Sequence, residues 1–401
     1  MTTYLIIGNG VAGNAAAENI RKHDPEGKIV VFSRESRPFY YVPGLPEYLA
    51  GEKAADQIIL HHQDWYDQHR IELHLNTRVT KIDAAQKFVE TGEGQRFPFD
   101  KLLLATGGNS FVPPMQGADS PGVFTLRTLD DADRIKQAAA GAKTAVLIGG
   151  GLLGLEAGNG LRKLGLKIVV VEFFPRLLPR QMDPAGAAIL AREMEDMGFT
   201  FHLGAKTREI ARDSGGLTVN LESGEKITGD LVLISAGVRP DLTLAQALGL
   251  DIDKGVKVDD TMQTSRESIY AAGDLIEHRG RFYGIWPAAM EQGAVAGAAM
   301  AGHLAQYEGT LPSNVLKVVG IDLVAAGDID ADGKLTAVVH ADPARKSYRK
   351  LVLQDNLLVG AILLGDIRGS AEIQAAIKKK QDISHLKDEL AQADFDFKRL
   401  G

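Results

Sequence analysis

The sequence predicts an α/β protein in which one parallel-sheet domain is inserted into another and a small α+β domain follows. Two glycine motifs about 140 residues apart, each at the end of an apolar run, predict the parallel sheets. They are Gly8-Asn9-Gly10-Val11-Ala12-Gly13 after Tyr4–Ile7, and Gly149-Gly150-Gly151-Leu152-Leu153-Gly154 after Ala145–Ile148. From about Leu311 the pattern changes, and strands over 350–353 and 358–364 precede a helix over 371–380, which predicts the third domain.

Each glycine motif is typical of a strand that turns sharply into a helix whose N-terminus faces a pyrophosphate. The first glycine permits the turn, the second lets a phosphate approach the backbone, and the third lets helix and strand pack closely. One such motif is weak, because an ordinary glycine turn looks the same. Two copies in this context predict two Rossmann-like dinucleotide sites, with electrons passing between them. The expected contacts are Gly8, Gly10, Val11, Ala12 and Gly13 in one site, and Gly149, Gly151, Leu152, Leu153 and Gly154 in the other.

The composition of the chain excludes several kinds of reaction and partner. The chain has 401 residues, 45% of them hydrophobic, with a formal net charge of -7 and no cysteine. The absence of cysteine excludes disulfides, dithiol relays, thiolate nucleophiles and cysteine-bound iron–sulfur clusters. The negative charge and the lack of a long basic cluster predict no nucleic-acid partner. We predict neither a metal site nor catalytic side chains.

The chain enters a strand directly after Met1-Thr2-Thr3, which leaves no room for a signal peptide. No apolar run approaches the roughly 20 residues that span a bilayer. The stretch 288–301 is interrupted by Glu291 and Gln292 and is interpreted as a buried helix. We therefore expect a cytoplasmic enzyme without a membrane partner.

The elements follow in a regular order. In the first domain we expect a helix over 12–23 and strands over 28–32, 71–75, 88–89 and 102–104, the last ending at Ala105-Thr106-Gly107-Gly108. Residues 38–51 are interpreted as a functional loop or a short irregular helix. In the second domain we expect helices over 152–164 and 185–197 and strands over 167–172 and 231–234, the last ending at Ser235-Ala236-Gly237. The strand over 269–272 ends at Gly273-Asp274.

Proline-rich residues 111–114 and Pro240 predict the two crossovers between these domains. The expected boundaries are 1–110 with 238–308 for the first domain, 111–237 for the inserted one and 309–401 for the last.

Acidic residues at strand ends predict ribose contacts. Glu172 stands at this place in the second domain and favours NADH over NADPH, because a carboxylate repels a 2′-phosphate. Arg176 and Arg180 follow it and would weaken that preference by pairing with a phosphate. In the first domain the place falls on Ser33, and Glu35 is the expected ribose contact.

Three further residues each admit two interpretations. Glu156, on the first turn of the second nucleotide helix, either reaches the nicotinamide or is a carboxylate favoured by the helix dipole. Asp274 is either a ligand contact at a strand end or a turn aspartate. Trp286 either begins a helix that stabilises a reduced flavin or packs in the core. The run 378–380 of lysines is either a guide for an acidic partner or a solvated helix face.

Together these residues resemble the pyridine-nucleotide flavoprotein reductase family, in which an NADH domain is inserted in an FAD domain. The motifs that carry the resemblance are GNGVAG, LLLATGG, LRTLDDA, GGGLLGLEAG, the VVE strand end, SAGVRPD and YAAGDL. LKVVGIDLVAAGD and YRKLVLQDNLLVGAILLGD make the chain most similar to NADH:rubredoxin oxidoreductases and the flavin part of NADH-dependent nitrite reductases. The resemblance implies that the cofactors are FAD and NADH and favours the nicotinamide role for Glu156. The residues implied to hold the cofactors also include Val79, Thr106, Gly107, Arg127, Gly237, Asp274 and Trp286.

The sequence also departs from related reductases. Where disulfide reductases and thiol-dependent NADH oxidases carry a motif like Cys-Gly-Leu-Pro, this chain has Pro43-Gly44-Leu45-Pro46, which excludes their chemistry. Related ferredoxin reductases often place a lysine where Glu47 stands, and an arginine common in this loop is replaced by the stretch Tyr41-Val42. Because of these departures, the resemblance does not predict the flavin environment or the redox potential.

The resulting hypothesis is hydride transfer from NADH to flavin N5, followed by single-electron release to a small redox protein, with rubredoxin as the favoured acceptor. One alternative acceptor is oxygen, peroxide or a quinone. Another alternative is a flavin-bearing binding subunit of a larger complex.

Overall fold

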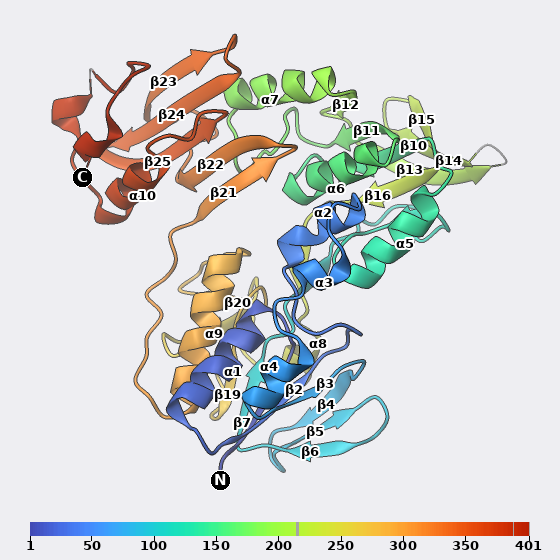
Figure 1. Ribbon diagram of the computed structural model, residues 1–401, viewed down its shortest axis with the longest axis vertical. Coiled ribbons are helices and arrows are strands. Elements are labelled where there is room, and N and C mark those ends of the chain that lie inside the picture. Colours follow the sequence, from blue (N-terminus) through green and yellow to red (C-terminus); the bar gives the residue numbers. More distant parts are fainter. Residues whose placement is uncertain (214–215, 388, 401) are drawn as a thin grey trace.

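The computed structural model describes residues 1–213, 216–387 and 389–400. Three units, each built on its own five-stranded sheet, follow one another in space (Figure 1). We call them the N-terminal, central and C-terminal units. The fold confirms the predicted α/β class: the first two sheets are parallel and the third is antiparallel.

The N-terminal unit contains a parallel sheet of order β19-β7-β1-β2-β3. Because β1 is flanked by β2 on one side and β7 on the other, the strand order reverses at β1, and ligands of open α/β sheets bind at such a point. The strands are β1 (Thr3–Ile7), β2 (Lys28–Phe32), β3 (Ile71–His74), β7 (Lys101–Leu104) and β19 (Ile269–Ala271). The smaller elements are β4 (Val79–Asp83), β5 (Phe88–Thr91), β6 (Arg96–Pro98), α4 (Gln63–Gln68), α8 (Thr243–Ala247), β18 (Val256–Val258) and β20 (Ile276–His278).

The central unit repeats this arrangement with a sheet of order β12-β11-β10-β16-β9. Its strands are β9 (Val123–Phe124), β10 (Thr144–Ile148), β11 (Lys167–Glu172), β12 (Phe199–Leu203) and β16 (Leu231–Ile234), and its helices are α5 (Leu129–Ala139), α6 (Leu152–Lys163) and α7 (Pro184–Asp196). An antiparallel sheet of β13 (Thr207–Asp213), β14 (Gly216–Leu221) and β15 (Lys226–Gly229) packs beside it. The chain enters and leaves this unit through β8 (Gly108–Ser110) and β17 (Val238–Pro240), which pair as an antiparallel ribbon.

The C-terminal unit is an antiparallel sheet of order β21-β22-β25-β24-β23. Alternate residues of β22 face opposite sides: Leu323 and Ala325 join the core shared with the central unit, whereas Val324 and Ala326 pack under α10. The elements are β21 (Ser313–Val318), β22 (Ile321–Gly327), β23 (Thr336–Asp342), β24 (Ser347–Gln354), β25 (Leu357–Leu364), α10 (Ser370–Lys379), η2 (Ser384–Leu386) and η3 (Phe397–Leu400). The lysines at 378–380 are exposed at the end of α10.

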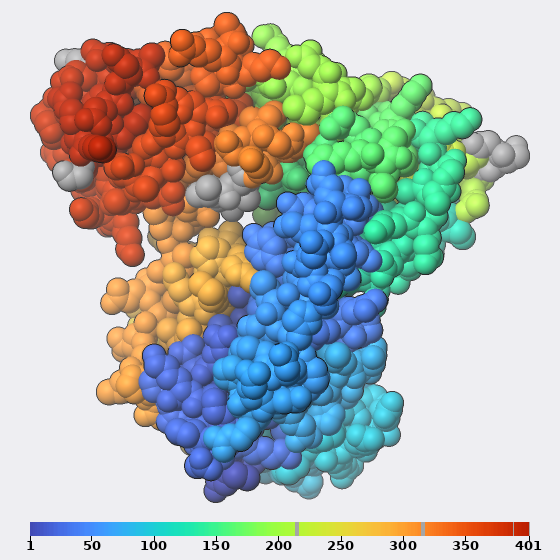
Figure 2. Space-filling model, in the orientation of Figure 1, coloured from blue at the N-terminus to red at the C-terminus, as the bar shows by residue number. Residues whose placement is uncertain are grey.

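One hydrophobic core joins three parts of the chain. It contains Leu45 and Leu49 from the N-terminal third, Leu155 of α6 and Ile362 of β25. The stretch predicted as a loop or irregular helix contributes η1 (Val42–Gly44) and α2 (Leu45–Leu49), followed by α3 (Ala55–Ile58). Figure 2 shows this blue segment lying over the green central unit. The C-terminal unit thus shares its core with the central unit.

Helices α1 (Val11–His23) and α9 (Trp286–Met300) pack with their backbones nearly touching. A Cβ added to Gly293 would lie 2.2 Å from the Ala12 carbonyl oxygen, and one added to Gly297 would lie 2.3 Å from that of Ala16. These contacts explain why the stretch interpreted as a buried helix is rich in glycine and alanine. Among the described residues, no helix is long and apolar enough to cross a bilayer.

We expect Gly297→Ala to destabilise the protein by about 2 kcal/mol, because the added methyl overpacks against a backbone oxygen that cannot turn away. In an ordinary helix the same change stabilises by about 1 kcal/mol. Urea unfolding of the two proteins measures the difference. Ala16→Gly should not rescue the variant, since the obstructing atom belongs to the backbone. A more stable Gly297→Ala protein would contradict the close packing.

Candidate functional site

The first cavity lies at the carboxyl end of β1, where the predicted glycine motif turns into α1. Its volume is about 350 Å³. Seven of the predicted contacts line it: Gly8, Gly10, Glu35, Val79, Thr106, Gly107 and Arg127. Val11, Ala12 and Gly13 lie behind them at the start of α1.

The glycine loop leaves polar groups unpaired toward this cavity. The Asn9 side-chain Nδ2 is buried without a hydrogen-bond partner among the described residues, although Asn9 lines the cavity. α1 begins at Gly10, which offers no side-chain cap, so the first N–H groups of the helix are free to bind an anion. A Cβ on Gly10 would meet nothing within 4 Å. The loop therefore fits the pyrophosphate of the expected FAD.

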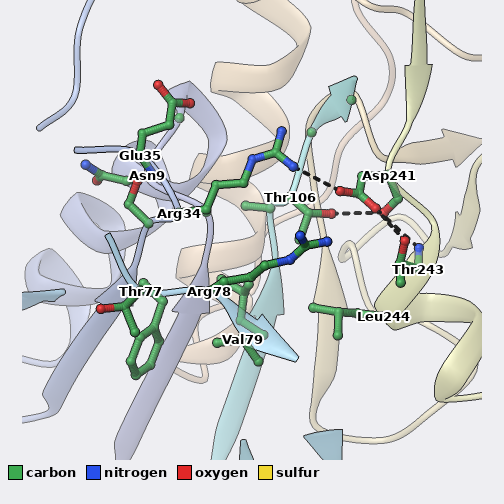
Figure 3. A pocket seen from close by; sticks show the side chains of 18 of the residues that line it. Asn9, Arg34, Glu35, Thr77, Arg78, Val79, Thr106, Asp241, Thr243 and Leu244 are labelled. Carbon is green, nitrogen blue, oxygen red and sulfur yellow. Dashed lines mark hydrogen bonds and ion pairs between the residues drawn. The ribbon is translucent and has the colours of Figure 1, made fainter. Parts of the chain in front are cut away.

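The first cavity is also lined by residues that the sequence did not predict, among them Arg34, Arg78, Asp241 and Thr243. Figure 3 shows Arg34 extending toward Asp241, with its Nη1 3.4 Å from the carboxylate Oδ2. Burial opposes ionisation of Asp241, but hydrogen bonds from Thr243 and Asn109 and the charge of Arg34 lower its pKa overall. The one signal for these arginines was their place near strand ends: Arg78 directly precedes β4, and Arg34 follows β2 after Ser33. The separation of 207 positions between Arg34 and Asp241 hid the pair.

Glu35, the expected ribose contact, is engaged elsewhere. Its Oε2 accepts a hydrogen bond of 2.6 Å from the Tyr40 hydroxyl, and burial raises the pKa of Glu35. Figure 3 shows its carboxylate pointing away from the Arg34–Asp241 pair. Ser33 accepts a hydrogen bond from the Glu35 N–H through its Oγ. The ribose role of Glu35 stays a prediction.

Arg127 and Asp274, both implied to contact FAD, contact each other at 3.1 Å. Arg127 lines the first cavity, whereas Asp274 lies behind it at the end of β19. Trp286 begins α9 and stacks on Phe39, with ring centroids 5.7 Å apart, and meets Tyr41 edge-on. Trp286 is half-buried and belongs to none of the hydrophobic cores of the described residues, so both interpretations for Trp286 stay predictions.

A buried network supports the glycine loop from behind. The Tyr66 hydroxyl lies 3.0 Å from Oδ1 of both Asn9 and Asn14, and His61 Nδ1 lies 3.1 Å from Asn14 Oδ1. The His61 ring stacks on Trp65 with centroids 3.7 Å apart. Burial lowers the pKa of His61 to about 4, and the charge of His69 acts in the same direction. His61 is therefore neutral in the folded protein at pH 7.

The neutral His61 predicts that stability falls as the solution becomes acidic. Below the unfolded value of 6.5 the unfolded chain binds a proton that the folded chain refuses until about pH 4. The free energy of unfolding should therefore drop by about 3 kcal/mol between pH 6.5 and 4 through this group. Denaturant titrations at several pH values measure the drop. His61→Gln should flatten this part of the profile and His62→Gln, on the exposed neighbour, should not; equal profiles for all three proteins would contradict the expectation.

The second cavity lies at the corresponding place in the central unit and measures about 630 Å³. Six predicted contacts line it: Gly149, Gly151, Leu152, Leu153, Glu172 and Gly237. Gly154 lies behind them, where an added Cβ would stand 2.6 Å from the Gly149 carbonyl oxygen. α6 begins at Gly151 without a side-chain cap, as α1 does at Gly10. This repetition fits a second pyrophosphate.

Glu172 lines the second cavity, and two backbone N–H groups hold its carboxylate. Its Oε2 accepts a hydrogen bond of 2.5 Å from the Gly150 N–H and its Oε1 one of 2.7 Å from the Phe174 N–H. The carboxylate is buried, so solvent and salt screen its charge less than that of an exposed group. Arg176 points to the carbonyls of Pro179 and Met182, whereas Arg180 and Lys206 line the cavity.

We expect NADH to be preferred over NADPH and Glu172→Gln to raise the NADPH:NADH ratio of kcat/KM about tenfold, since removing one like charge removes repulsion of the 2′-phosphate. Steady-state kinetics with both nucleotides measure the ratio. Arg180→Gln is the matched control and should move the ratio the opposite way. An unchanged ratio in Glu172→Gln would contradict the role of this carboxylate.

Glu156 does not line the second cavity. Its Oε1 accepts a hydrogen bond of 2.5 Å from the backbone N–H of Val319 in the C-terminal unit. Burial raises the pKa of Glu156, and the Val319 hydrogen bond opposes that rise. The nicotinamide role of Glu156 stays a prediction. In the described part of the chain, no group of three or more His, Asp or Glu side chains could hold a metal ion.

Comparison with known proteins gives family matches for most of the chain. Residues 2–293 match the model of the pyridine nucleotide-disulphide oxidoreductase family, and residues 312–381 match that of the rubredoxin NAD+ reductase C-terminal domain. The chain is 37% identical over 382 residues to a nitrite reductase (NAD(P)H) of Bacillus subtilis, covering 95% of this chain and 48% of that protein. It is 36% identical over 282 residues to rubredoxin-NAD(+) reductase of Pseudomonas putida, covering 70% of this chain and 73% of that protein.

Among solved structures, NADH:rubredoxin oxidoreductase from Clostridium acetobutylicum superposes with a TM-score of 0.83 at 28% identity, covering 97% of this chain and 99% of that one. The chain spans about half the length of the nitrite and nitrate reductase relatives from Bacillus subtilis.

Proposed function

The chain belongs to the pyridine nucleotide-disulphide oxidoreductase family as an oxidoreductase with FAD and NADH as cofactors, and on this premise we propose that it reduces a small redox protein, with rubredoxin as the favoured partner. The FAD held there would supply the chemistry of hydride acceptance and electron transfer. The protein supplies binding sites and orientation. Since the sequence has no cysteine, no side-chain dithiol takes part, unlike the chemistry that gives the family its name.

One observation carries the proposal: a single ribbon lines both cavities. Gly108 of β8 lines the first cavity, while Ser110 of β8 and Val238 of β17 line the second. β8 and β17 pair in register, so the two ligand sites are held at a defined separation across this ribbon. Two nucleotides bound there would both lie against this ribbon, which supports transfer of electrons from one to the other.

Different residues of the first cavity would contact different parts of the cofactor. The N-terminus of α1, after Gly10, presents backbone N–H donors that would hold the pyrophosphate of FAD. Arg127, fixed by Asp274, places a cation at the cavity wall. A cation there would stabilise negative charge on a reduced ligand.

The experiment mixes the purified holoprotein with NADH under anaerobic conditions and follows flavin absorbance. We expect bleaching, and then faster reoxidation by rubredoxin than by oxygen. Faster reoxidation by oxygen would replace the proposed acceptor with oxygen. Absence of bleaching would refute both reductase functions and leave a flavin-bearing binding subunit.

A second candidate acceptor is a reductase module for nitrogen oxyanions. Its support is the 35% identity over 96% of this chain to the assimilatory nitrate reductase electron transfer subunit of Bacillus subtilis, of which the chain spans half. In that case the electrons would leave for a partner domain or subunit. The rubredoxin assay distinguishes the candidates, because a protein built for such a partner should reduce free rubredoxin slowly.

A further inference from the structure

The turn between β21 and β22 reaches from the C-terminal unit to the nucleotide helix of the central unit. It has two residues, Val319 and Gly320, because Val318 and Ile321 already pair across the strands. Both turn residues have left-handed backbones, with φ of 55° and 87°. The Val319 N–H donates to Glu156 on α6, and the Val319 side chain is buried in the core shared with the central unit.

Valine is an unfavourable residue for this turn. Two-residue hairpins with left-handed φ at both positions favour asparagine, aspartate or glycine, and a β-branched residue there is strained by about 1–3 kcal/mol. The other such turn of the same sheet, Asp355–Asn356, uses favourable residues, with φ of 51° and 63°. Turn chemistry therefore does not account for Val319. Its contacts with the central unit do.

Glu156 occupies a junction of three elements. It stands one helical turn after Leu152, so both lie on one face of α6, and Leu152 lines the second cavity. Glu47 and Glu52, around α2, raise the pKa of Glu156 and Lys163 lowers it. The Val319 N–H is the donor that holds the carboxylate among these charges.

We propose that the Val319–Gly320 turn is a positioning element of the nucleotide site: the C-terminal unit fixes Glu156, and through it the nicotinamide end of the second cavity, by one backbone hydrogen bond. The proposal rests on the proposed function, since it assigns a new part to the same site. It also gives the C-terminal unit a role in nucleotide binding. Val319 acts through Glu156 and is a positioning residue.

The test inserts one glycine between Val319 and Gly320 in the full-length holoprotein. The matched control inserts one glycine between Asp355 and Asn356, in the exposed turn of the same sheet. Calorimetry then measures binding of NAD+ and of ADP-ribose, which lacks the nicotinamide. We expect the first insertion to lower the affinity for NAD+ about tenfold, because one hydrogen bond to a charged group is lost. The affinity for ADP-ribose should stay unchanged. The control should alter neither.

Two outcomes overturn the proposal: an unchanged NAD+ affinity, or equal weakening of NAD+ and ADP-ribose, which would indicate general damage to the site. Failure of the proposed function is a different result, because then NADH would not bleach the flavin of the unaltered protein. The binding comparison would still decide the role of the turn.

If the variant with the glycine insertion does not fold, a second measurement on Glu156 variants tests the same proposal. Hydrogen exchange at the Val319 amide should accelerate about tenfold in Glu156→Leu and stay slow in Glu156→Gln, whose side-chain oxygen still accepts the bond. Glu156→Leu should also weaken NAD+ relative to ADP-ribose, with partial rescue in Glu156→Gln. Equal exchange in both variants would refute the hydrogen bond as the link between the units.

Discussion

Gly8→Ala is expected to yield a protein that cannot retain FAD. Gly8 has a φ of 119°, and an added Cβ would stand 2.0 Å from the Ala105 carbonyl oxygen at the end of β7. Neither backbone can yield, because β1 and β7 pair in the middle of the sheet. Strain of about 3 kcal/mol at the loop corresponds to a loss of FAD affinity of more than about 100-fold. The flavin absorbance of the purified protein measures the loss.

Gly149→Ala makes the same change in the second copy of the motif. Its φ is also 119°, and an added Cβ would stand 2.2 Å from the Ser235 carbonyl oxygen. This variant should keep its FAD and lose bleaching by NADH. The two variants should lose different properties, because the first glycine motif would bind FAD and the second would bind NADH. Loss of FAD from both variants, or from neither, would contradict that division.

Gly10→Ala and Gly151→Ala are the matched controls for folding. An added Cβ at either position meets no protein atom within 4 Å, so both variants should fold. Each variant should still bind its nucleotide more weakly, because the added methyl enters the space left for a pyrophosphate. Comparing thermal unfolding with nucleotide binding therefore separates damage to the fold from damage to the site.

Lys350→Ala is expected to lower the free energy of unfolding by about 3–5 kcal/mol, because it leaves buried carboxylates without their counter-charge. Lys350 is 4% exposed; its Nζ lies 3.4 Å from Asp183 Oδ2 and donates to the Asp330 carbonyl oxygen at 2.7 Å. Asp183 also accepts a 2.6 Å hydrogen bond from the Tyr348 hydroxyl and caps α7. Denaturant unfolding followed by circular dichroism measures the change.

Lys334→Ala is the control, since Lys334 and its partner Asp332 both lie at the surface. Its loss should stay below about 1 kcal/mol. Replacing Asp183 by asparagine in the Lys350→Ala background should recover part of the stability, as one uncompensated charge disappears. Equal losses for the two lysines would show that the buried pair contributes no more than a surface pair.

The parallel sheets were predictable because their strands are short apolar runs bounded by glycine. The predicted strands 28–32, 167–172 and 231–234 agree with β2, β11 and β16. The antiparallel sheet β13-β14-β15 was missed, since short strands that carry charged residues, as β13 does on both sides of Ile210-Ala211, give weak signals one strand at a time. Strands β21 to β23 were not predicted either.

The glycines and strand-end residues of both cavities were predictable because local backbone geometry demands them. Arg34 and Asp241 were not, because their meeting depends on the chain returning from the central unit through β17. For Glu156, the sequence predicted the residue's place but not its contact. Its place on α6 was evident, but its partner Val319 belongs to a unit whose packing against α6 no local pattern reveals.

The shared core also determines the order in which the chain can fold during synthesis. The N-terminal sheet lacks its edge strand β19 until well after the central unit has been made. The central unit in turn keeps apolar surface around Leu190 uncovered until Tyr348 and Ile362 of the C-terminal unit emerge. We therefore expect no unit to reach its final stability on the ribosome, and chains stopped after α9 to depend on chaperones.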